Sequence, residues 1–417
     1  MKKLNIFLSV LIALSLNAQE NIKYQKPSDE ILNLVEFDRP PSVLYDDEKN
    51  YMVFLYRNNY KSISDLSEKE LRLGGLRINP KTNIGSRVTY YNNVKVKNLK
   101  DKKGQTEQVI GIPENAKLTN FSWSPDQTKI ALTNTTSEGV ELWLLTLKTG
   151  YVTKLTAPEL NANIGSAITW NTDSQLMFVK MLSPNKQPLI DTKSVVPNGP
   201  TVSTNFGAKA QNRTYQDLLK NKFDEHNFEQ LSTSTIFKVS INGESEKWLD
   251  EAMYRGISLS PDGKYVMVTQ LKKPFSYLVT YSRFPSQTDI YTNKGELVTN
   301  LLDTPLIEEL PKGRMSTRTG KRSYSWRPDQ PSTLIYVQAL DQGDPAIKTE
   351  YRDEVFEIAA PFNGEGKSLV KTINRFSGID WGTENLAIAY DYWWDTRNRK
   401  AYAFNPSKPE SMPKTIY

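Results

Sequence analysis

Short apolar stretches alternate with tight polar turns along most of this 417-residue chain. Five of the turns share a pattern in which a large apolar residue is followed three places later by an acidic residue: Trp123 to Asp126, Trp170 to Asp173, Leu259 to Asp262, Trp326 to Asp329 and Trp381 to Glu384. The stretches after the turns are rich in β-branched, aromatic or aliphatic residues, as in 129–133 and 265–269. The pattern predicts a strand on each side of every turn.

The repetition of this turn predicts a β-propeller. A weaker copy begins at Leu44, which makes six copies, and the interval from Trp123 to Trp170 is close to the roughly 40 to 50 residues of one four-stranded blade. One hairpin cannot bury its own apolar face, whereas several arranged radially can. We therefore expect an all-β fold with about seven blades, within a range of six to eight, and short helical insertions. The repeat tryptophans, including Trp326 and Trp381, are expected in the core.

The first residues have the features of a secretory signal. Met1-Lys2-Lys3 precedes an apolar run from Leu4 to Leu16, and small and polar residues follow it. This pattern predicts cleavage after Ala18. A membrane anchor is the competing interpretation, but the run is too short to span a bilayer. The predicted organisation is a signal peptide over 1–18 and a propeller domain over 19–417 that is incomplete at its C-terminal end. The protein is expected to be exported to the periplasm or secreted, with no membrane span.

Charge and composition limit the ligands that the chain is expected to bind. With 53 Lys and Arg against 47 Asp and Glu the net charge is +6, and the excess is dispersed, so no nucleic-acid partner is predicted. The absence of cysteine excludes disulfides and thiolate metal sites. There is no zincin motif, phosphate loop or dinucleotide fingerprint. The sequence therefore predicts no metal and no cofactor.

Three stretches interrupt the strand pattern. The first, Ser64 to Leu73, has capping-box spacing between Ser67 and Glu70 and predicts a short helix that ends at Gly74-Gly75. The second, from Pro184 to about Leu231, predicts a loop followed by one or two helical turns. The third, Leu271 to Pro285, is densely aromatic and basic. Because binding residues concentrate on such loops, candidate site residues are sought there.

No catalytic site is recognisable in the chain. A serine hydrolase needs a base, usually histidine, and the chain contains one histidine, His226, in a polar segment that predicts a surface position. The string nearest to a nucleophile elbow, 256–260, lacks the second glycine and falls in a predicted strand. We therefore expect no catalytic residues and no peptidase activity in this chain alone.

Several motifs resemble a known family. The strings are 64–87, 197–201, 210–219, 283–285, 326–329, 339–345, 352–353, 360–362 and 392–397. Together they resemble the glutamyl endopeptidase branch of the prolyl oligopeptidase-type serine peptidases, over essentially the whole mature chain. The resemblance implies an N-terminal β-propeller, an α/β-hydrolase domain that carries the catalytic serine, aspartate and histidine, and an active site between the two.

The resemblance implies that only the propeller part is present here. No position can inherit the three catalytic roles, so the hydrolase domain is expected to be absent. A truncated gene product and a genuine non-catalytic propeller are the two explanations. Residues 399–404 predict a strand and 409–417 predict the approach to another. A chain that stops within a blade would leave unpaired edges.

The resemblance also implies a role for basic residues. A propeller of this family restricts access to the cavity and helps to hold peptide or unfolded polypeptide, acting together with the hydrolase domain. Cleavage after glutamate requires neutralisation of a carboxylate, for which arginine is best suited. Arg213 and Arg283 are the first candidates for substrate binding, Lys273 and Lys272 are weaker ones, and Tyr277 is expected on the same surface. Structural ion pairs are the alternative role for each base.

Two functions thus remain open at the level of sequence. One is the propeller, substrate-gating part of an exported serine peptidase that is inactive alone. The other is a free-standing periplasmic propeller that binds a protein or an envelope component. The natural substrate and the oligomeric state do not follow from the sequence.

Overall fold

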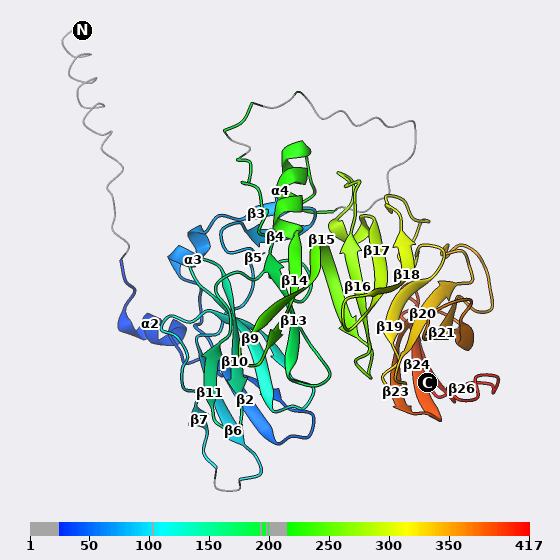
Figure 1. Cartoon of the computed structure of the whole chain (residues 1–417), viewed down its shortest axis with the longest axis horizontal. Helices are drawn as coiled ribbons and strands as arrows, with labels where there is room; N and C mark the ends of the chain where they lie inside the picture. The colour runs from blue at the N-terminus through cyan, green and yellow to red at the C-terminus, as the bar shows by residue number, and fades with distance from the viewer. Residues whose placement is uncertain (1–24, 102–103, 192–193, 197–198, 200–214) are drawn as a thin grey trace, which may run out of the picture.

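A computed structural model describes residues 25–101, 104–191, 194–196, 199 and 215–417. The predicted signal peptide, Arg213 and most of the motif 197–201 lie outside the described residues. The described chain is all-β, as predicted, and consists mainly of antiparallel sheets that follow one another in sequence order (Figure 1).

The sheets comprise four four-stranded sheets and one seven-stranded sheet, together with a small three-stranded one. The long strand β15 (Ser245–Leu259) pairs with β14 through its first half and with β16 through its second half, so the seven-stranded sheet is two four-stranded units that share a strand. This gives six propeller-like units, at the lower end of the expected six to eight. The outermost strand of the sixth unit, Lys414–Thr415, pairs with β25, so that unit also has four strands.

The units are numbered sheets 1 to 6 in chain order. Sheet 1 contains β1 (Ser42–Tyr45), β2 (Tyr51–Tyr56), β6 (Asn93–Asn98) and β7 (Glu107–Gln108); sheet 2 contains β8 (Leu118–Trp123), β9 (Lys129–Thr135), β10 (Val140–Thr146) and β11 (Tyr151–Lys154). Sheet 3 contains β12 (Ile168–Trp170), β13 (Leu176–Leu182), β14 (Ser234–Ser240) and β15; sheet 4 contains β15, β16 (Tyr265–Leu271), β17 (Ser286–Thr292) and β18 (Leu297–Thr304). Sheet 5 contains β19 (Arg322–Trp326), β20 (Thr333–Ala339), β21 (Asp353–Ala359) and β22 (Lys367–Thr372); sheet 6 contains β23 (Arg375–Thr383), β24 (Leu386–Tyr392), β25 (Arg399–Phe404) and β26 (Lys414–Thr415).

An apolar layer separates each sheet from the next. Val53 of sheet 1 and Leu132 of sheet 2 belong to one cluster, and equivalent clusters join sheets 2 and 3, 3 and 4, 4 and 5, and 5 and 6. Middle strands such as β9 are therefore buried on both faces. Among the described residues, no such apolar cluster joins sheet 6 to sheet 1. Side-chain packing thus links the sheets into an arc.

The repeated turn joins the first two strands of a sheet, as predicted. The side chains of Ser124 and Asp126 hydrogen-bond at 2.5 Å, and those of Ser260 and Asp262 at 2.7 Å, which fixes the conformation of the turn. Of the repeat tryptophans, Trp170 is only 8% exposed. Three others are half-buried and pack against the apolar layers: Trp123, Trp326 and Trp381.

The insertions gather at one end of the molecule, called here the upper face, which is at the top of Figure 1. Because strands alternate in direction, every connection from a second to a third strand leaves from the end opposite the repeated turn. Between β2 and β6 lie α3 (Ile63–Ser67) and the small sheet of β3 (Leu71–Leu73), β4 (Leu76–Asn79) and β5 (Ile84–Gly85). Between β13 and β14 lies α4 (Lys222–Ser232), and between β16 and β17 the 3-10 turn η1 (Tyr281–Arg283). A further helix, α2 (Asp29–Val35), lies beside sheet 1 (Figure 1).

The helix expected from Ser64 to Leu73 was placed wrongly. Helix α3 ends at Ser67, its capping box joins Ser62 to Asp65 rather than Ser67 to Glu70, and Leu71–Leu73 is a strand. Gly74 and Gly75 form the turn of the β3–β4 hairpin, with φ of 58° and 90°. The alternation of Leu71 and Leu73 with Arg72 is a period-2 signal, and tertiary contacts of the hairpin favour it over helix. The second insertion is more helical than expected, since α4 has 11 residues.

Candidate functional site

The three insertions pack together on the upper face around Phe228 of α4. Leu73 and Ile78 come from the first insertion, and Val279 and Phe284 from the third, and all are buried in one cluster with Phe228. Three segments that are far apart in sequence therefore form one platform above the sheets. The platform combines the stretches that the sequence singled out as irregular.

The Gly74-Gly75 turn locks the first insertion against the other two. The N–H of Gly75 donates to the backbone oxygen of Asp217 at 2.8 Å, and the N–H of Tyr281 donates to that of Gly74 at 2.7 Å. A Cβ on Gly75 would lie 2.7 Å from the Thr280 methyl carbon, closer than side chains allow. The positive φ and this close approach together require glycine at position 75.

Lys273 and Tyr277, two of the predicted site residues, contact acidic side chains of α4. The Lys273 ammonium lies 2.7 Å from a Glu229 carboxylate oxygen, and the Tyr277 hydroxyl donates to Glu225 at 2.5 Å. Burial and the neighbouring Glu225 carboxylate raise the pKa of Tyr277 to about 12. Both residues thus hold the third insertion against α4. The ion pair of Lys273 corresponds to the role in structural ion pairs that the sequence analysis gave as the alternative to substrate binding.

Of the other predicted residues that are described, Lys272 is exposed and its backbone N–H donates to the oxygen of Pro285 at 2.7 Å, and Arg283 is the last residue of η1. Its guanidinium carbon lies 5.4 Å from the centre of the Tyr215 ring, within cation–π range. A second arginine, Arg255, approaches the same turn, since its guanidinium donates to the backbone oxygen of Ser282 at 3.4 Å and lies 6.0 Å from the Tyr281 ring. The structure therefore brings Arg283 and Arg255 to one 3-10 turn.

Sequence reasoning missed Arg255. In the pairing of β15 with β16, Tyr254 faces Gln270 and Gly256 faces Thr269, so Arg255 is the extra residue of a β-bulge. Bulges redirect a side chain away from the regular alternation of a strand. The sequence signal for this bulge was Gly256, a glycine directly after an arginine within a strand. That signal was not sufficient, because the bulge forms only when β15 pairs with β16.

Other arginines of the platform are neutralised by carboxylates. Arg77 binds Asp217 at 2.6 Å, and Arg72 and Arg87 bind Glu70 at 2.8 and 3.3 Å. The hydrogen bond from the Ser86 hydroxyl, together with the two arginines, lowers the pKa of Glu70 to about 2. These arginines hold the small sheet together.

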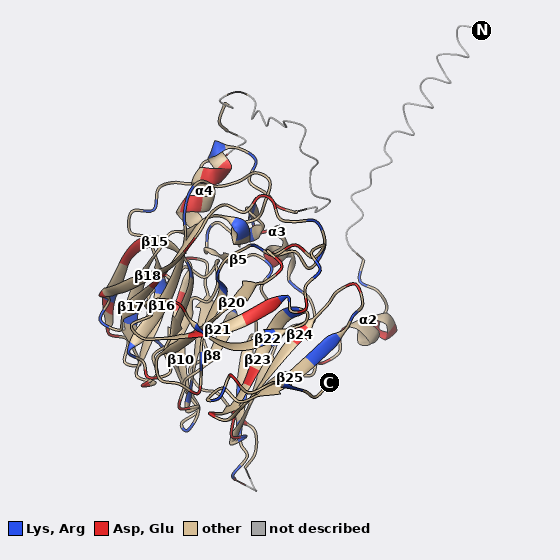
Figure 2. Ribbon diagram, turned by 90° about the vertical axis from the view of Figure 1, so that its right-hand side faces the viewer, with Lys and Arg blue, Asp and Glu red and all other residues tan. Residues whose placement is uncertain are grey.

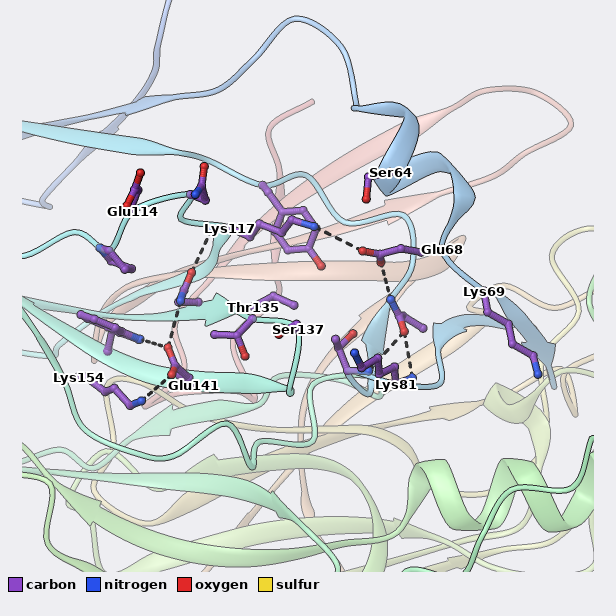
Figure 3. A pocket seen from close by; sticks show the side chains of 18 residues that line it. Ser64, Glu68, Lys69, Lys81, Glu114, Lys117, Thr135, Ser137, Glu141 and Lys154 are labelled. Carbon is purple, nitrogen blue, oxygen red and sulfur yellow. Dashed lines mark hydrogen bonds and ion pairs between the residues drawn. The ribbon is translucent and has the colours of Figure 1, made fainter.

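A polar cavity of about 890 Å³ lies between the first insertion and sheet 2 (Figure 3). Lys117 points toward Glu68 and Lys154 toward Glu141, at 3.5 and 2.6 Å. The Trp143 N–H also donates to Glu141, at 2.8 Å. These two ion pairs include four of the seven charged side chains that line the cavity, and no histidine is among the lining residues.

The single histidine is half-buried, where the sequence predicted an exposed surface position. His226 lies on α4, and its Nε2 is 3.0 Å from the backbone oxygen of Pro188. The part of the chain that the structure describes contains no group of three or more His, Cys, Asp or Glu side chains that could hold a metal. Within that part, no helix is long and apolar enough to cross a membrane.

No protein-family model matches the chain. Two curated relatives do, along almost its whole length. A probable chloroplastic glutamyl endopeptidase of Oryza sativa subsp. japonica is 33% identical over 408 residues, which is 94% of this chain and 43% of the relative. The protein of the same name from Arabidopsis thaliana is 30% identical over 407 residues, with 94% and 42% covered. The chain thus spans less than half the length of the curated relatives that it matches.

Solved structures with similar backbones share little sequence with the chain. An acylaminoacyl peptidase of Pyrococcus horikoshii superposes with a TM-score of 0.42 at 13% identity, over 89% of this chain and 45% of the other. An oligogalacturonate lyase of Vibrio parahaemolyticus superposes with a TM-score of 0.41 at 13% identity, over 90% and 84%. The resemblance inferred from the motifs is confirmed by the sequence relatives: along nearly all of its length, this chain is homologous to proteins named glutamyl endopeptidase.

Proposed function

We propose that this chain is the substrate-gating propeller part of an exported serine peptidase of the glutamyl endopeptidase type. The observation that carries the proposal is the 33% identity to a probable glutamyl endopeptidase over 94% of the chain. The role of the upper face is to bind peptide or unfolded polypeptide. In this proposal, hydrolysis depends on an α/β-hydrolase domain, the partner that such a propeller needs.

Arg283 and Arg255 are the proposed carboxylate-binding residues of this face. Both guanidinium groups lie at η1, which the platform holds in place from three sides. A guanidinium presents a planar set of donors that matches a carboxylate, so two of them at one turn suit an acidic side chain of a peptide. Lys273 and Tyr277 contribute by fixing the third insertion on α4 rather than by contacting the peptide.

The chain by itself is proposed to be catalytically inactive. The Nε2 atom of its one histidine contacts a backbone oxygen, that of Pro188. A histidine that acts as a base must instead contact the serine hydroxyl. Treatment with a fluorophosphonate probe and with peptides containing glutamate tests this point, with an active serine hydrolase as the positive control. We expect no labelled serine and no cleavage. Stoichiometric labelling would contradict the proposal.

Binding is the direct test of the proposed role. A fluorescein-labelled peptide with a single internal glutamate, measured by fluorescence anisotropy, is expected to bind more tightly than its glutamine counterpart. Arg283→Gln and Arg255→Gln should each weaken binding of the glutamate peptide about fivefold or more, because each removes a charge-assisted hydrogen bond. Arg39→Gln, an exposed arginine beyond α2, is the matched control. Equal affinities for the two peptides would refute the proposal.

Export is part of the proposal and is tested separately. Expression of the full-length chain in a bacterium with two membranes should yield a periplasmic protein whose N-terminus is Gln19. A cytoplasmic protein that retains Met1 would refute export without affecting the binding proposal.

The alternative is a free-standing propeller that binds a protein or an envelope component. One observation favours it: each of the six sheets draws four strands from this chain, including β26 for the last. Reconstitution distinguishes the two functions. If peptide hydrolysis appears when a separately produced hydrolase domain of a relative is added, the peptidase function is supported.

A further inference from the structure

A second group of arginines and tryptophans lies at the upper ends of sheets 5 and 6, and strands of these sheets are labelled in Figure 2. It is built over a buried ionic network. Asp341 and Asp353 are both 0% exposed, and Arg375 binds one at 2.8 Å and the other at 3.0 Å. Arg352 binds Asp341 at 2.8 Å and Arg322 binds Asp353 at 2.5 Å. Three guanidinium groups thus meet two carboxylates, so the network keeps one positive charge in excess.

The network also fixes the connection between sheets 4 and 5, residues 305–321. The Arg375 Nε–H donates to the backbone oxygen of Met315 at 2.8 Å, and the N–H of Thr317 donates to that of Gly343 at 3.0 Å. A Cβ on Gly343 would lie 2.0 Å from the Thr317 oxygen, so only glycine permits this approach. Residues 305–321 are therefore held beside the β24–β25 turn by contacts to rigid elements.

The outer layer of the group is a stack on Trp394. The guanidinium carbon of Arg314, from the fixed connection, lies 4.5 Å from the ring centre, and that of Arg397, from the β24–β25 turn, lies 3.8 Å from it. Arg397 also donates to the Tyr392 hydroxyl at 3.0 Å. Beneath them, Arg352 lies 4.1 Å from the centre of the Trp393 ring. The indole and the tyrosine thus hold both outer guanidinium groups in defined positions.

Arg314 and Arg397 are exposed, and within the described part of the chain no carboxylate lies within ion-pair distance of either. Asp395 is adjacent in sequence but forms no ion pair with them in that part. Two guanidinium groups are thus held close together with no carboxylate in ion-pair distance. Such a concentration of positive charge attracts an anionic group of another molecule.

We infer that the Arg314–Trp394–Arg397 stack is a docking surface for an acidic stretch of polypeptide. The two guanidinium carbons lie at most about 8 Å apart, because both are close to one ring centre. Alternate side chains on one face of an extended peptide are about 7 Å apart. Because a glutamate side chain is flexible and spans several ångströms, two carboxylates of a Glu-x-Glu segment can each meet one arginine over a separation of this size. The inference goes beyond the proposed role of Arg283, since a different surface carries it.

The test is binding of a fluorescein-labelled (Glu-Ala)₄ peptide to the full chain at low salt, by fluorescence anisotropy. Arg314→Gln/Arg397→Gln should weaken binding about tenfold or more, because two charge-assisted contacts are lost. Trp394→Leu, which leaves the charge unchanged, should weaken it about threefold. The control Lys148→Gln/Lys294→Gln removes the same charge from exposed turns between third and fourth strands, and should change binding less than about twofold.

The outcomes separate this inference from the proposed function. Affinity within twofold of the parent in the double arginine variant, with an unchanged thermal midpoint, would overturn the inference. Equal weakening in the lysine control would also overturn it, because general electrostatic attraction would then explain binding. If Arg283→Gln alone abolishes binding while the Arg314→Gln/Arg397→Gln variant binds normally, the proposed function is supported and this inference fails.

Discussion

The indole N–H of Trp326 donates to the backbone oxygen of Ser258, 3.2 Å away in the first strand of the preceding sheet. Trp170 makes the equivalent contact with Ser122 at 3.0 Å. At these two positions the tryptophan therefore has two roles, since its ring packs in the apolar layer between two sheets and its N–H binds the backbone of the preceding sheet. This explains why a polar-tipped aromatic residue, rather than leucine, recurs at the end of the first strand.

The first prediction concerns this contact. Trp170→Ala should lower the free energy of unfolding by about 3 to 5 kcal/mol, because it removes a buried ring and leaves a cavity between sheets 2 and 3. Trp326→Ala should cost less, since that ring is half-buried. Denaturant midpoints measure both changes, and Tyr60→Ala, at a side chain that is 65% exposed, is the control. If Trp170→Ala is as mild as the control, the packing between these sheets is described wrongly.

The second prediction concerns the hairpin turn of the first insertion. Gly75→Ala should destabilise the protein by more than Gly150→Ala, although both glycines have positive φ. At Gly150 a Cβ meets nothing within 4 Å, so only the backbone conformation is penalised, by about 1 kcal/mol. At Gly75 the clash with Thr280 adds to that penalty. Thermal unfolding measures the difference, and Thr280→Gly should recover part of it. Equal effects at the two glycines would show that the hairpin is not clamped.

The third prediction concerns Lys180, which is buried in sheet 3 and donates to the backbone oxygen of Ile164. Burial lowers its pKa from the usual 10.5 to about 7. Between these values the unfolded chain holds one proton more than the folded chain, so this group makes stability rise with pH from about 7 to 10.5 and leaves it unchanged below 7.

Lys180→Met should therefore remove this contribution. The unfolding free energy of the parent minus that of the variant should increase between pH 7 and pH 10, by up to about 1.4 kcal/mol per pH unit. Urea unfolding at the two pH values measures this difference, in which the other titrating groups cancel. Lys148→Met, at an exposed lysine, should show no such trend. A constant difference for Lys180→Met would mean that the ammonium stays charged in the folded state.

The fourth prediction concerns local stability along the arc. Amides of β24 and β25 should exchange with solvent faster than those of β16, because sheet 6 has an apolar layer toward sheet 5 but, among the described residues, none toward sheet 1. Native-state hydrogen exchange with mass spectrometry compares peptides covering 386–404 and 265–269. Equal, strong protection of both segments would show that sheet 6 is covered on both sides, and would favour the free-standing propeller.

The sheets were predictable because their signals are local. An apolar strand, a turn with Ser and Asp side chains and a second strand fall within about fifteen residues, so Trp123 to Thr135 can be interpreted without knowledge of the rest of the chain. The β3–β4 hairpin was not predicted, because its glycines are selected by contacts with Phe228 and Thr280, which lie over 150 residues away.

The site was predicted only in part, for the same reason. Arg283 was found because it lies in an irregular basic segment, whereas Arg255 lies in a regular-looking strand that becomes a bulge through pairing with β16. The carboxylate partners of Lys273 and Tyr277 are on another insertion, and the stack of Arg314 and Arg397 joins two connections. Pairing between distant segments does not follow from periodicity.

The long strand β15 has a mechanical consequence. Since its first half pairs with β14 and its second half with β16, an unbroken strand joins sheets 3 and 4 in addition to the apolar layer between them, and we call this pair of sheets the central plate. Between sheets 2 and 3 and between sheets 5 and 6 there are apolar layers and hydrogen bonds, such as that from Trp170 to Ser122, but no shared strand. If the arc opens to admit a polypeptide, sheets 1 and 2 and sheets 5 and 6 should therefore move relative to the central plate. The turn η1 connects two strands of that plate, β16 and β17, and should keep its geometry during such a movement.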